Sequence, residues 1–111
     1  MTDQRRRGPR YAFIACAELL EARTDTRIAT RVSELSMTGC YLDMLNPFPT
    51  GTLALVKISA GDAQFISKAR VVYAQPNFGA GVEFLETEPQ YLEVLKAWIQ
   101  DAQKDPDRLT G

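Results

Sequence analysis

Arginine residues are concentrated at the start of the 111-residue chain. Four of them, Arg5, Arg6, Arg7 and Arg10, lie within six residues of one another, and none of the basic residues there is a lysine. A guanidinium group is planar and presents its N–H donors as a fork, so arginine suits phosphates, guanine edges and the faces of flat rings. Four arginines against one aspartate give residues 1–10 a net charge of +3, and nine basic against 13 acidic side chains give the rest −4. The sequence therefore predicts a short, flexible basic arm on an acidic body.

A second group of polar and small residues follows 24 residues after Arg10. Glu34, Ser36 and Gly39 form an acid-x-Ser-x-x-Gly pattern. The carboxylate accepts hydrogen bonds, the hydroxyl donates one, and glycine permits a positive φ and the close approach of another group. Alone, Ser36 and Gly39 are typical of an ordinary loop. Together with the arginines they indicate a binding site.

The composition disfavours catalysis. Histidine is absent, which removes the commonest general base and the commonest metal ligand. No lysine is placed by sequence to activate Ser36, and the carboxylates lack the spacing of an acid/base pair or a metal pair. Cys16 and Cys40 lie in apolar stretches, and we expect two buried thiols instead of a disulfide. The sequence thus predicts a protein that is not an enzyme and that holds no metal and no cofactor.

No segment is typical of a membrane or export signal. The longest apolar run, Tyr11–Ala17, is far shorter than the ~20 residues of a membrane span. The N-terminal residues turn basic without an apolar stretch or a small-residue cleavage site, and lipidation motifs are absent. We therefore expect a cytoplasmic location and no membrane insertion.

The elements that must position these residues are mostly strands. With 45% hydrophobic and 24% charged residues, the composition is that of one globular domain. Alternating apolar residues between turn signals predict six strands: Tyr11–Glu21, Arg27–Glu34, Cys40–Met44, Thr52–Ala60, Gln64–Ala74 and Phe78–Leu85. Their spacing predicts a closed or nearly closed antiparallel barrel. Gly79 and Gly81, inside the last strand, indicate a bulge or a close backbone contact.

A helix is expected to follow the strands, from about residue 88. Thr87 and Gln90 have the spacing of a capping box, with Thr87 as the N-cap residue, and Pro89 lies in the first turn. An apolar stripe at helical spacing is expected to pack on the barrel: Leu92, Leu95 and Ile99, flanked by Tyr91 and Trp98. We expect the domain to cover residues 11–103, between the arm at 1–10 and a disordered tail at 104–111.

The two motifs together resemble those of the PilZ domain family, receptors for the bacterial second messenger cyclic di-GMP. That family has RxxxR near its N-terminus and then (Asp or Asn)-x-Ser-x-x-Gly, which correspond here to Arg6–Arg10 and Glu34–Gly39. Gly79–Phe84 is similar to the family's final GxGVxF strand. The resemblance extends from Arg5 to about Ile99. It implies a mainly β fold, a six-stranded antiparallel split β-barrel with one C-terminal α-helix.

The resemblance also assigns roles to the arginines. Arg6 and Arg10 match the two arginines of RxxxR, which in the family bind guanine edges and phosphates of the ligand. Arg7 makes the run RRxxR, a family variant, and is implied as a third contact. Arg5 precedes the motif, at a position that influences whether one or two ligand molecules bind. Cyclic di-GMP has two phosphate charges and two guanines, which forked guanidinium groups bind well.

In the second motif, Ser36 and Gly39 match the family and Glu34 departs from it. The resemblance implies that Ser36 offers a hydroxyl donor and that Gly39 permits the turn and the approach of the ligand. The family has Asp or Asn at the position of Glu34, and the extra methylene moves the carboxylate and adds a rotamer to fix. One misplaced polar contact weakens binding by ~1–3 kcal/mol. We therefore expect weaker binding of cyclic di-GMP, or none.

These observations leave three functions to compare. The first is a cyclic di-GMP receptor that couples the level of the second messenger to an unidentified downstream protein. The second is a degenerate PilZ-like adaptor that contacts proteins and binds no nucleotide, which Glu34 favours. The third, a binder of nucleic acid polymers, is disfavoured by the charge of −4 outside the arm. The oligomeric state stays open between a monomer and a homodimer.

Overall fold

Six strands and one helix form the described part of the chain, residues 9–104 of a computed structural model. They are β1 (Tyr11–Glu21), β2 (Arg27–Leu35), β3 (Gly39–Asp43), β4 (Leu53–Ala60), β5 (Ala63–Gln75), β6 (Gly79–Glu86) and α2 (Pro89–Lys104). Every predicted strand is confirmed, and its bounds lie within one residue of the expectation. The expectations for the arm up to residue 8 and for the tail from residue 105 lie outside the described residues.

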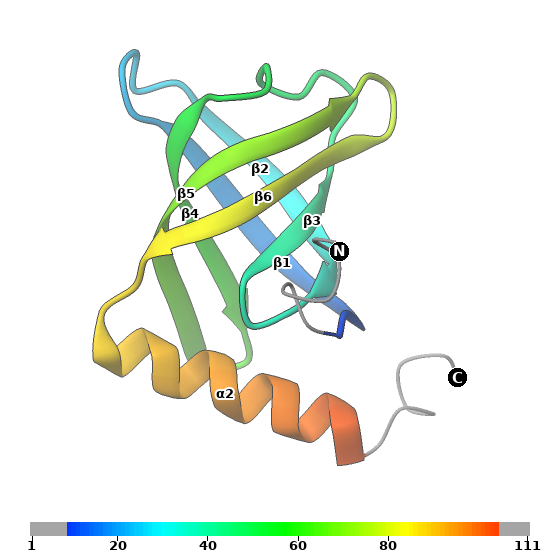
Figure 1. The fold of residues 1–111 in the computed structure, drawn as a ribbon, viewed down its shortest axis with the longest axis vertical. Helices are drawn as coiled ribbons and strands as arrows, with labels where there is room; N and C mark the ends of the chain where they lie inside the picture. Colours follow the sequence, from blue (N-terminus) through cyan, green and yellow to red (C-terminus); the bar gives the residue numbers. More distant parts are fainter. Residues whose placement is uncertain (1–8, 105–111) are drawn as a thin grey trace, which may run out of the picture.

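The strands close into a barrel in the order β1-β2-β3-β6-β5-β4, with β4 pairing back to β1 (Figure 1). Every pairing is antiparallel, so the mainly β, antiparallel architecture expected from the sequence is confirmed. Because the strands run alternately up and down, the turn from β2 to β3 lies at the same end of the barrel as α2. The turn from β5 to β6 lies at the opposite end (Figure 1).

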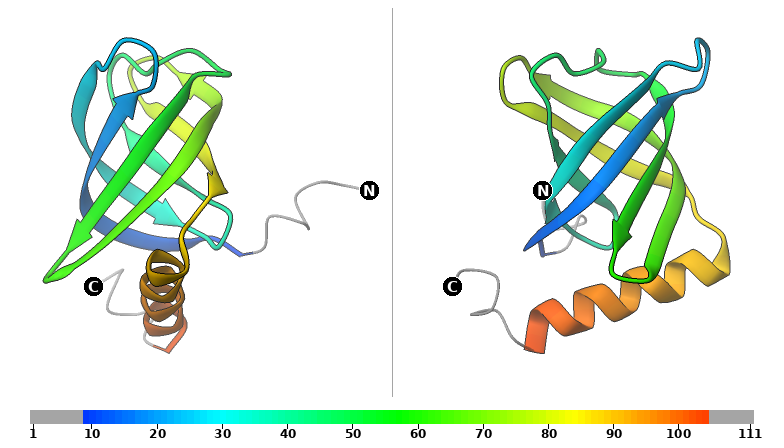
Figure 2. Two further views of the ribbon diagram at one scale, coloured as in Figure 1. Left: turned by 90° about the vertical axis from the view of Figure 1, so that its left-hand side faces the viewer. Right: turned by 180° about the vertical axis from the view of Figure 1, so that it is seen from behind.

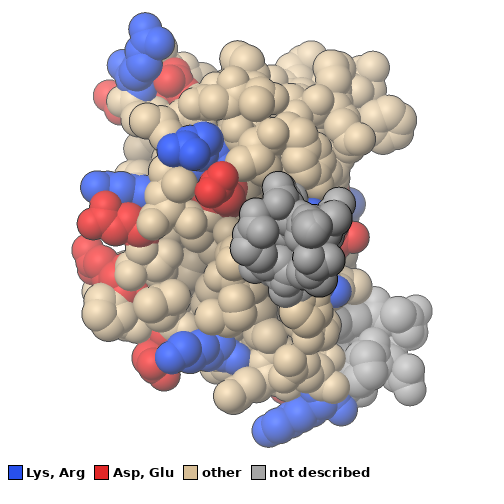
Figure 3. Space-filling model, viewed as in Figure 1, with Lys and Arg blue, Asp and Glu red and all other residues tan. Residues whose placement is uncertain are grey.

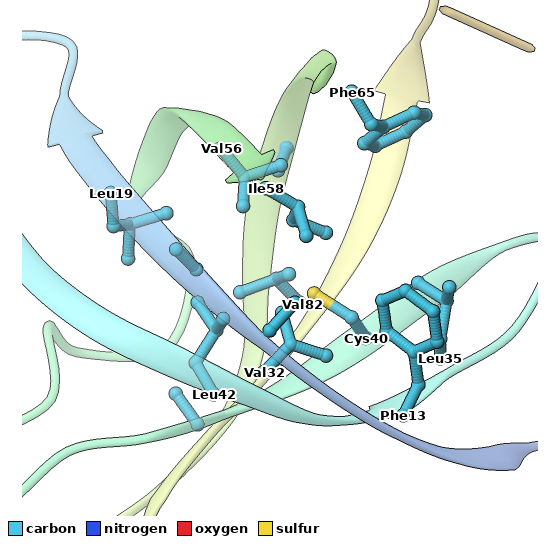
Figure 4. Packing of buried hydrophobic residues seen from close by; sticks show 14 of the residues in the cluster. Phe13, Leu19, Val32, Leu35, Cys40, Leu42, Val56, Ile58, Phe65 and Val82 are labelled. Carbon is cyan, nitrogen blue, oxygen red and sulfur yellow. The ribbon is translucent and has the colours of Figure 1, made fainter. Parts of the chain in front are cut away.

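The interior of the barrel is filled by every second residue of the strands. On β1, Phe13, Ala15, Ala17 and Leu19 point inward and are buried. Figure 4 shows Phe13 and Leu19 of β1 together with inward-pointing residues of the other strands, among them Val32, Leu42, Val56, Ile58, Phe65 and Val82. Such alternation is typical of a strand with one buried face. The buried layer gives the outer face of the barrel a rigid support.

The alternation separates the two cysteines. Cys40 points into the barrel (Figure 4) and is buried, as expected. Cys16 is exposed, so the expectation of two buried thiols is wrong for this residue. It lies between the inward-pointing Ala15 and Ala17, and the two-residue period of the strand therefore turns it outward.

Helix α2 lies across one end of the barrel (Figures 1 and 2). Its residues Leu95, Ile99 and Ala102 are buried. The centroid of the Trp98 ring lies 5.1 Å from that of Phe13. Tyr91 and Trp98 pack against the core, as expected, whereas the predicted contact Leu92 is only partly covered and lies outside the core cluster. Within residues 9–104, no helix has the length and apolar character that crossing a membrane requires.

The start of α2 differs from the predicted capping box. The helix begins at Pro89, and the carbonyl oxygen of Glu88 accepts the first helical bonds, from the amides of Tyr91 and Leu92. Glu88 is therefore the N-cap residue, and the assignment of Thr87 is wrong. Proline favours the first helical position, which fixes the boundary here. The hydroxyl of Thr87 instead pairs with that of Ser67 at 2.6 Å and ties the end of β6 to β5.

Candidate functional site

A hollow of about 330 Å³ lies on the outer face of the barrel, beside the turn from β2 to β3. Arg10 contributes to it from the residue before β1, and Glu34 from the end of β2. The turn contributes residues 36, 38 and 39, and β3, β5 and β6 form the remaining wall. The structure thus brings Arg10, Glu34, Ser36 and Gly39 to one place, although 24 residues separate the first two. Arg5, Arg6 and Arg7 lie outside the described residues.

One row of residues across four strands forms the floor of this hollow. Glu34 of β2 pairs with Tyr41 of β3, Tyr41 pairs with Gly81 of β6, and Gly81 pairs with Tyr73 of β5. Directly paired residues of antiparallel strands point to the same face of the sheet. The side chains therefore share the outer face, and Gly81, which has none, leaves room for the Tyr73 ring to lie over the strand.

The turn from β2 to β3 is organised by the Ser36 hydroxyl. Its Oγ accepts the amide N–H of Thr38 at 3.2 Å and that of Gly39 at 3.1 Å. The Ser36 Oγ also lies 3.2 Å from the carbonyl oxygen of Gly39, to which it donates. Ser36 is 4% exposed, and its hydroxyl has partners for its hydrogen and its lone pairs within the turn. Ser36 therefore fixes the shape of the turn.

Gly39 is needed because strand β6 passes very close. A Cβ atom at residue 39 would lie 2.2 Å from the carbonyl oxygen of Val82, closer than any real contact. The close approach that the structure shows at Gly39 is that of β6, and the positive φ that glycine permits is not used here. The amide of Phe84 donates to the carbonyl of Thr38 at 2.8 Å and fastens the turn to β6.

Arg10 and Glu34 form an ion pair at the rim of the hollow. The Arg10 Nη1 lies 3.5 Å from the Glu34 Oε1, and the two side chains are 45% and 49% exposed. An exposed pair at this separation contributes at most about 1 kcal/mol. Both groups are therefore available to a ligand at little energetic cost.

A second carboxylate, that of Glu83, lies on the β6 side of the hollow. Glu83 pairs in register with Gly39 on one side and with Arg70 on the other. Its Oε1 is 3.9 Å from the Arg70 Nη1, at the outer limit of an ion pair. The hollow therefore offers two carboxylates and one guanidinium group from the described residues. In residues 9–104, no group of three or more His, Cys, Asp or Glu side chains is placed to hold a metal ion.

The sequence reasoning missed the aromatic part of this site. Tyr41 and Tyr73 line the hollow, with ring centroids 6.0 Å apart and an angle of 33° between the planes. The Tyr41 hydroxyl donates to the Gln75 Oε1 at 2.7 Å. Burial, followed by electrostatic interaction with Tyr73 and with the Asp43 and Glu34 carboxylates, raises the pKa of Tyr41 above its ordinary value. The period of two along β3 places the Tyr41 ring outside the barrel, whereas on β5 a register shift between Val71 and Tyr73 turns the Tyr73 ring outward, which the sequence pattern does not signal.

The comparisons with known proteins agree with this fold. The sequence profile of the PilZ domain matches residues 4–101. The PilZ domain of CeSA from a cellulose-synthesizing bacterium has a similar fold (TM-score 0.69, 16% identity, 86% of this chain and 99% of that chain covered). So does the PilZ domain of YcgR from Escherichia coli, solved with c-di-GMP (TM-score 0.73, 15% identity, 95% and 96% covered). A search of curated proteins finds no match. The profile spans most of the chain, and the chain therefore belongs to the PilZ domain family.

Proposed function

We propose that this protein is a receptor module for cyclic di-GMP, which it binds in the hollow beside the turn from β2 to β3. The observation that supports this most strongly is the convergence of both family motifs on one hollow: Arg10 from the first, and Glu34, Ser36 and Gly39 from the second. The PilZ domain of YcgR, which shares the fold, was solved with c-di-GMP. The same hollow offers guanidinium and carboxylate groups, which suit the phosphates and guanine edges of such a ligand.

Arg10 has the central role in this proposal. Its guanidinium group leaves Glu34 and forms a forked, charge-assisted contact with a phosphate or with the O6 and N7 atoms of a guanine. The exchange is favourable because the exposed pair with Glu34 is weak, whereas a bidentate contact to an anion is stronger. Arg6 and Arg7 would add positive charge. A dianionic ligand requires this charge because the Glu34 and Glu83 carboxylates also line the hollow.

Glu34 and Ser36 have different tasks. The Glu34 carboxylate, once released by Arg10, accepts hydrogen bonds from the N1–H and N2–H groups of a guanine. Ser36 acts through the turn, because its hydroxyl hydrogen already has an acceptor at the Gly39 carbonyl. The hydrogen bonds of Ser36 fix the backbone conformation of residues 36–39, a turn that lines the side of the hollow that the ligand contacts. Glu34 therefore contacts the ligand and Ser36 positions the site.

Calorimetric titration of the full chain with cyclic di-GMP tests the proposal. We expect saturable heat at micromolar concentrations, and we expect Arg10→Ala to abolish it. Arg27→Ala is the matched control, because Arg27 is also exposed and pairs with a glutamate, Glu18, at 3.1 Å but does not line the hollow. An absence of heat for the wild-type protein contradicts the function. Equal binding by Arg10→Ala contradicts the site.

A second function, an adaptor that binds proteins and no nucleotide, is favoured by Glu34, where the family has Asp or Asn. The longer Glu34 side chain reaches the Arg10 guanidinium group. In the adaptor, the two groups would stay paired with each other instead of binding a nucleotide. The variant Glu34→Asp separates the two functions. If the wild-type protein is a receptor, Glu34→Asp changes the affinity only moderately, whereas a change from no binding to binding identifies the adaptor.

We further propose that the module passes its signal to a separate protein in the bacterial cytoplasm. A bound dinucleotide would occupy the hollow and create a composite surface of ligand and protein. Such a surface exists only at sufficient ligand concentration, which makes the partner's binding dependent on the messenger. Affinity capture with and without cyclic di-GMP tests this step, and a partner retained equally in both conditions contradicts it.

A further inference from the structure

Two tyrosine rings cover two glycines on the outer face of β6. A Cβ atom at Gly81 would lie 2.3 Å from the Cε1 atom of Tyr73, and one at Gly79 would lie 2.8 Å from the Cε2 atom of Tyr41. Both glycines are buried although their register places them on the outer face, because the rings lie over them. The GxG pattern of β6 thus lets side chains from β3 and β5 lean across the strand between them.

One explanation for this arrangement is purely structural, since an aromatic ring often protects the backbone at a glycine in a sheet. That explanation accounts for the face of each ring that lies over a glycine. It does not account for the exposure of the other face in the hollow. Tyr41 and Tyr73 are only half-buried, lie side by side at 6.0 Å and both line the hollow. The hydroxyl of Tyr41 is anchored on Gln75, which holds that ring in place. The rings therefore form a partly open aromatic surface in the site, with Tyr41 held in place.

We propose that Tyr41 and Tyr73 form a shelf on which a guanine base of cyclic di-GMP stacks, with Tyr73 as the main contact. The inference rests on the proposed function and adds the contact that recognises the face of the base. A base needs partners at its polar edge and against its flat face, and Arg10 and Glu34 supply only the first. Tyr73 is the main contact because its ring lies over Gly81, in the middle of the row that contains Glu34.

The register places the edge and face contacts within reach of one base. Glu34 lies directly opposite Tyr41 on the neighbouring strand. Residues so paired have their Cβ atoms about 4.5–5.5 Å apart, which is comparable to the width of a base. A guanine lying on the shelf therefore presents its edge to the Glu34 carboxylate. A smaller pyrimidine covers less of the two rings, so the shelf also favours purine bases.

The test compares Tyr73→Leu with Tyr73→Phe in calorimetric titrations of the full chain with cyclic di-GMP. Leucine removes the aromatic face, and we expect the dissociation constant to rise about 5- to 150-fold, the range found when one stacked base loses its ring partner. Phenylalanine keeps the face, and we expect a change within about twofold, since the face supplies the stacking. Phe78→Leu is the matched control, because Phe78 is 71% exposed at the other end of the barrel and should leave binding unchanged.

The outcomes separate the shelf from the receptor function. Wild-type affinity in a folded Tyr73→Leu protein overturns the shelf and leaves the receptor function intact, whereas no binding by the wild-type protein overturns both. A loss in Tyr73→Phe as large as in Tyr73→Leu also overturns the shelf, because the hydroxyl would then be the contact. If thermal melting shows that Tyr73→Leu does not fold, Tyr41→Leu replaces it, with a smaller loss expected and wild-type affinity as the contradicting result.

Discussion

The turns from β2 to β3 and from β5 to β6 both reverse the chain between antiparallel strands, but they are held differently. The first depends on a side chain, since the Ser36 hydroxyl accepts two amides of the turn and donates to the Gly39 carbonyl. It also depends on contact with another strand, because Gly39 lies against the Val82 carbonyl. This turn adopts no positive φ.

The turn from β5 to β6 is held by its backbone. Asn77 adopts a φ of 75° after Pro76, which matches a type II turn, and the amide of Phe78 donates to the carbonyl of Gln75 at 2.9 Å. The amide of Asn77 and the carbonyl of Phe78 bond to the loop after β3. Phe78 itself is 71% exposed. On the face shown in Figure 3, the charged side chains of the described residues lie away from this turn.

The difference teaches where this fold tolerates change. A turn shaped by backbone conformation needs only a residue that accepts that conformation, and its side chains stay free. A turn shaped by a buried hydroxyl and a close strand crossing depends on particular atoms. The candidate site lies beside the turn from β2 to β3, which is of this side-chain-dependent kind. The geometry of the site is therefore specified by residues that do not all touch a ligand. Four predictions test this contrast.

The largest effect is expected in thiol reactivity, because Cys40 follows the Ser36–Gly39 turn directly and points into the barrel. Burial raises the pKa of the Cys40 thiol from 9.0 to about 12, which lowers its thiolate population about a thousandfold at neutral pH. With an aromatic disulfide reagent we expect Cys16 to react promptly and Cys40 at least about a hundredfold more slowly. Cys16→Ser should remove the fast phase. Two fast phases in the wild-type protein would show that the turn opens readily.

The next effect concerns Gly39→Ala. The new Cβ would meet the Val82 carbonyl at 2.2 Å, and a backbone atom cannot move aside as a flexible side chain would. We expect the free energy of unfolding in urea to fall by about 2–3 kcal/mol. Gly61→Ala is the matched control, since its Cβ would meet nothing within 4 Å and only its φ of 60° is strained, which costs about 1 kcal/mol. Equal losses in the two variants would contradict the proposed importance of the strand contact.

Ser36→Ala is expected to have a somewhat smaller effect. It leaves the amides of Thr38 and Gly39 without their acceptor, and we expect a loss of about 1–3 kcal/mol in the free energy of unfolding. Ser33→Ala, which removes one part-buried bond to Asp43, serves as the control at about 0.5–1 kcal/mol. We also expect weaker binding of cyclic di-GMP by Ser36→Ala. A variant that is destabilised but binds with wild-type affinity would show that the site does not depend on the shape of the turn.

Most of the fold was predictable because strands in this protein have one buried face. The period of two indicated the six strands, and turn-favouring residues, among them prolines and glycines, indicated the turns between them. The same period turns Cys16 outward, because it lies between the inward-pointing Ala15 and Ala17. The start of α2 was wrong by one residue because the capping pattern at Thr87 competed with the preference of Pro89 for the first helical position.

The polar half of the site was predictable, and the aromatic half was not. Arg10 and Glu34 were visible because charged side chains at motif spacing indicate a ligand. Tyr41 and Tyr73 lie in predicted strands, where a tyrosine is ordinary and indicates no ligand. Their role depends on register, because only the pairing of both with Gly81 brings the two rings together. Register between strands far apart in sequence is not encoded in any local pattern.

The smallest effect is expected for Asn77→Gly in the turn from β5 to β6. Glycine accepts a φ of 75° without the steric strain of a Cβ, but it adds conformational entropy to the unfolded chain. These terms oppose each other, so the free energy of unfolding should change by less than about 0.5 kcal/mol and the affinity for cyclic di-GMP should not change. Urea denaturation and calorimetry measure both. A loss above about 1 kcal/mol would mean that the Asn77 side chain shapes its turn as Ser36 does, and the contrast between the two turns would then disappear.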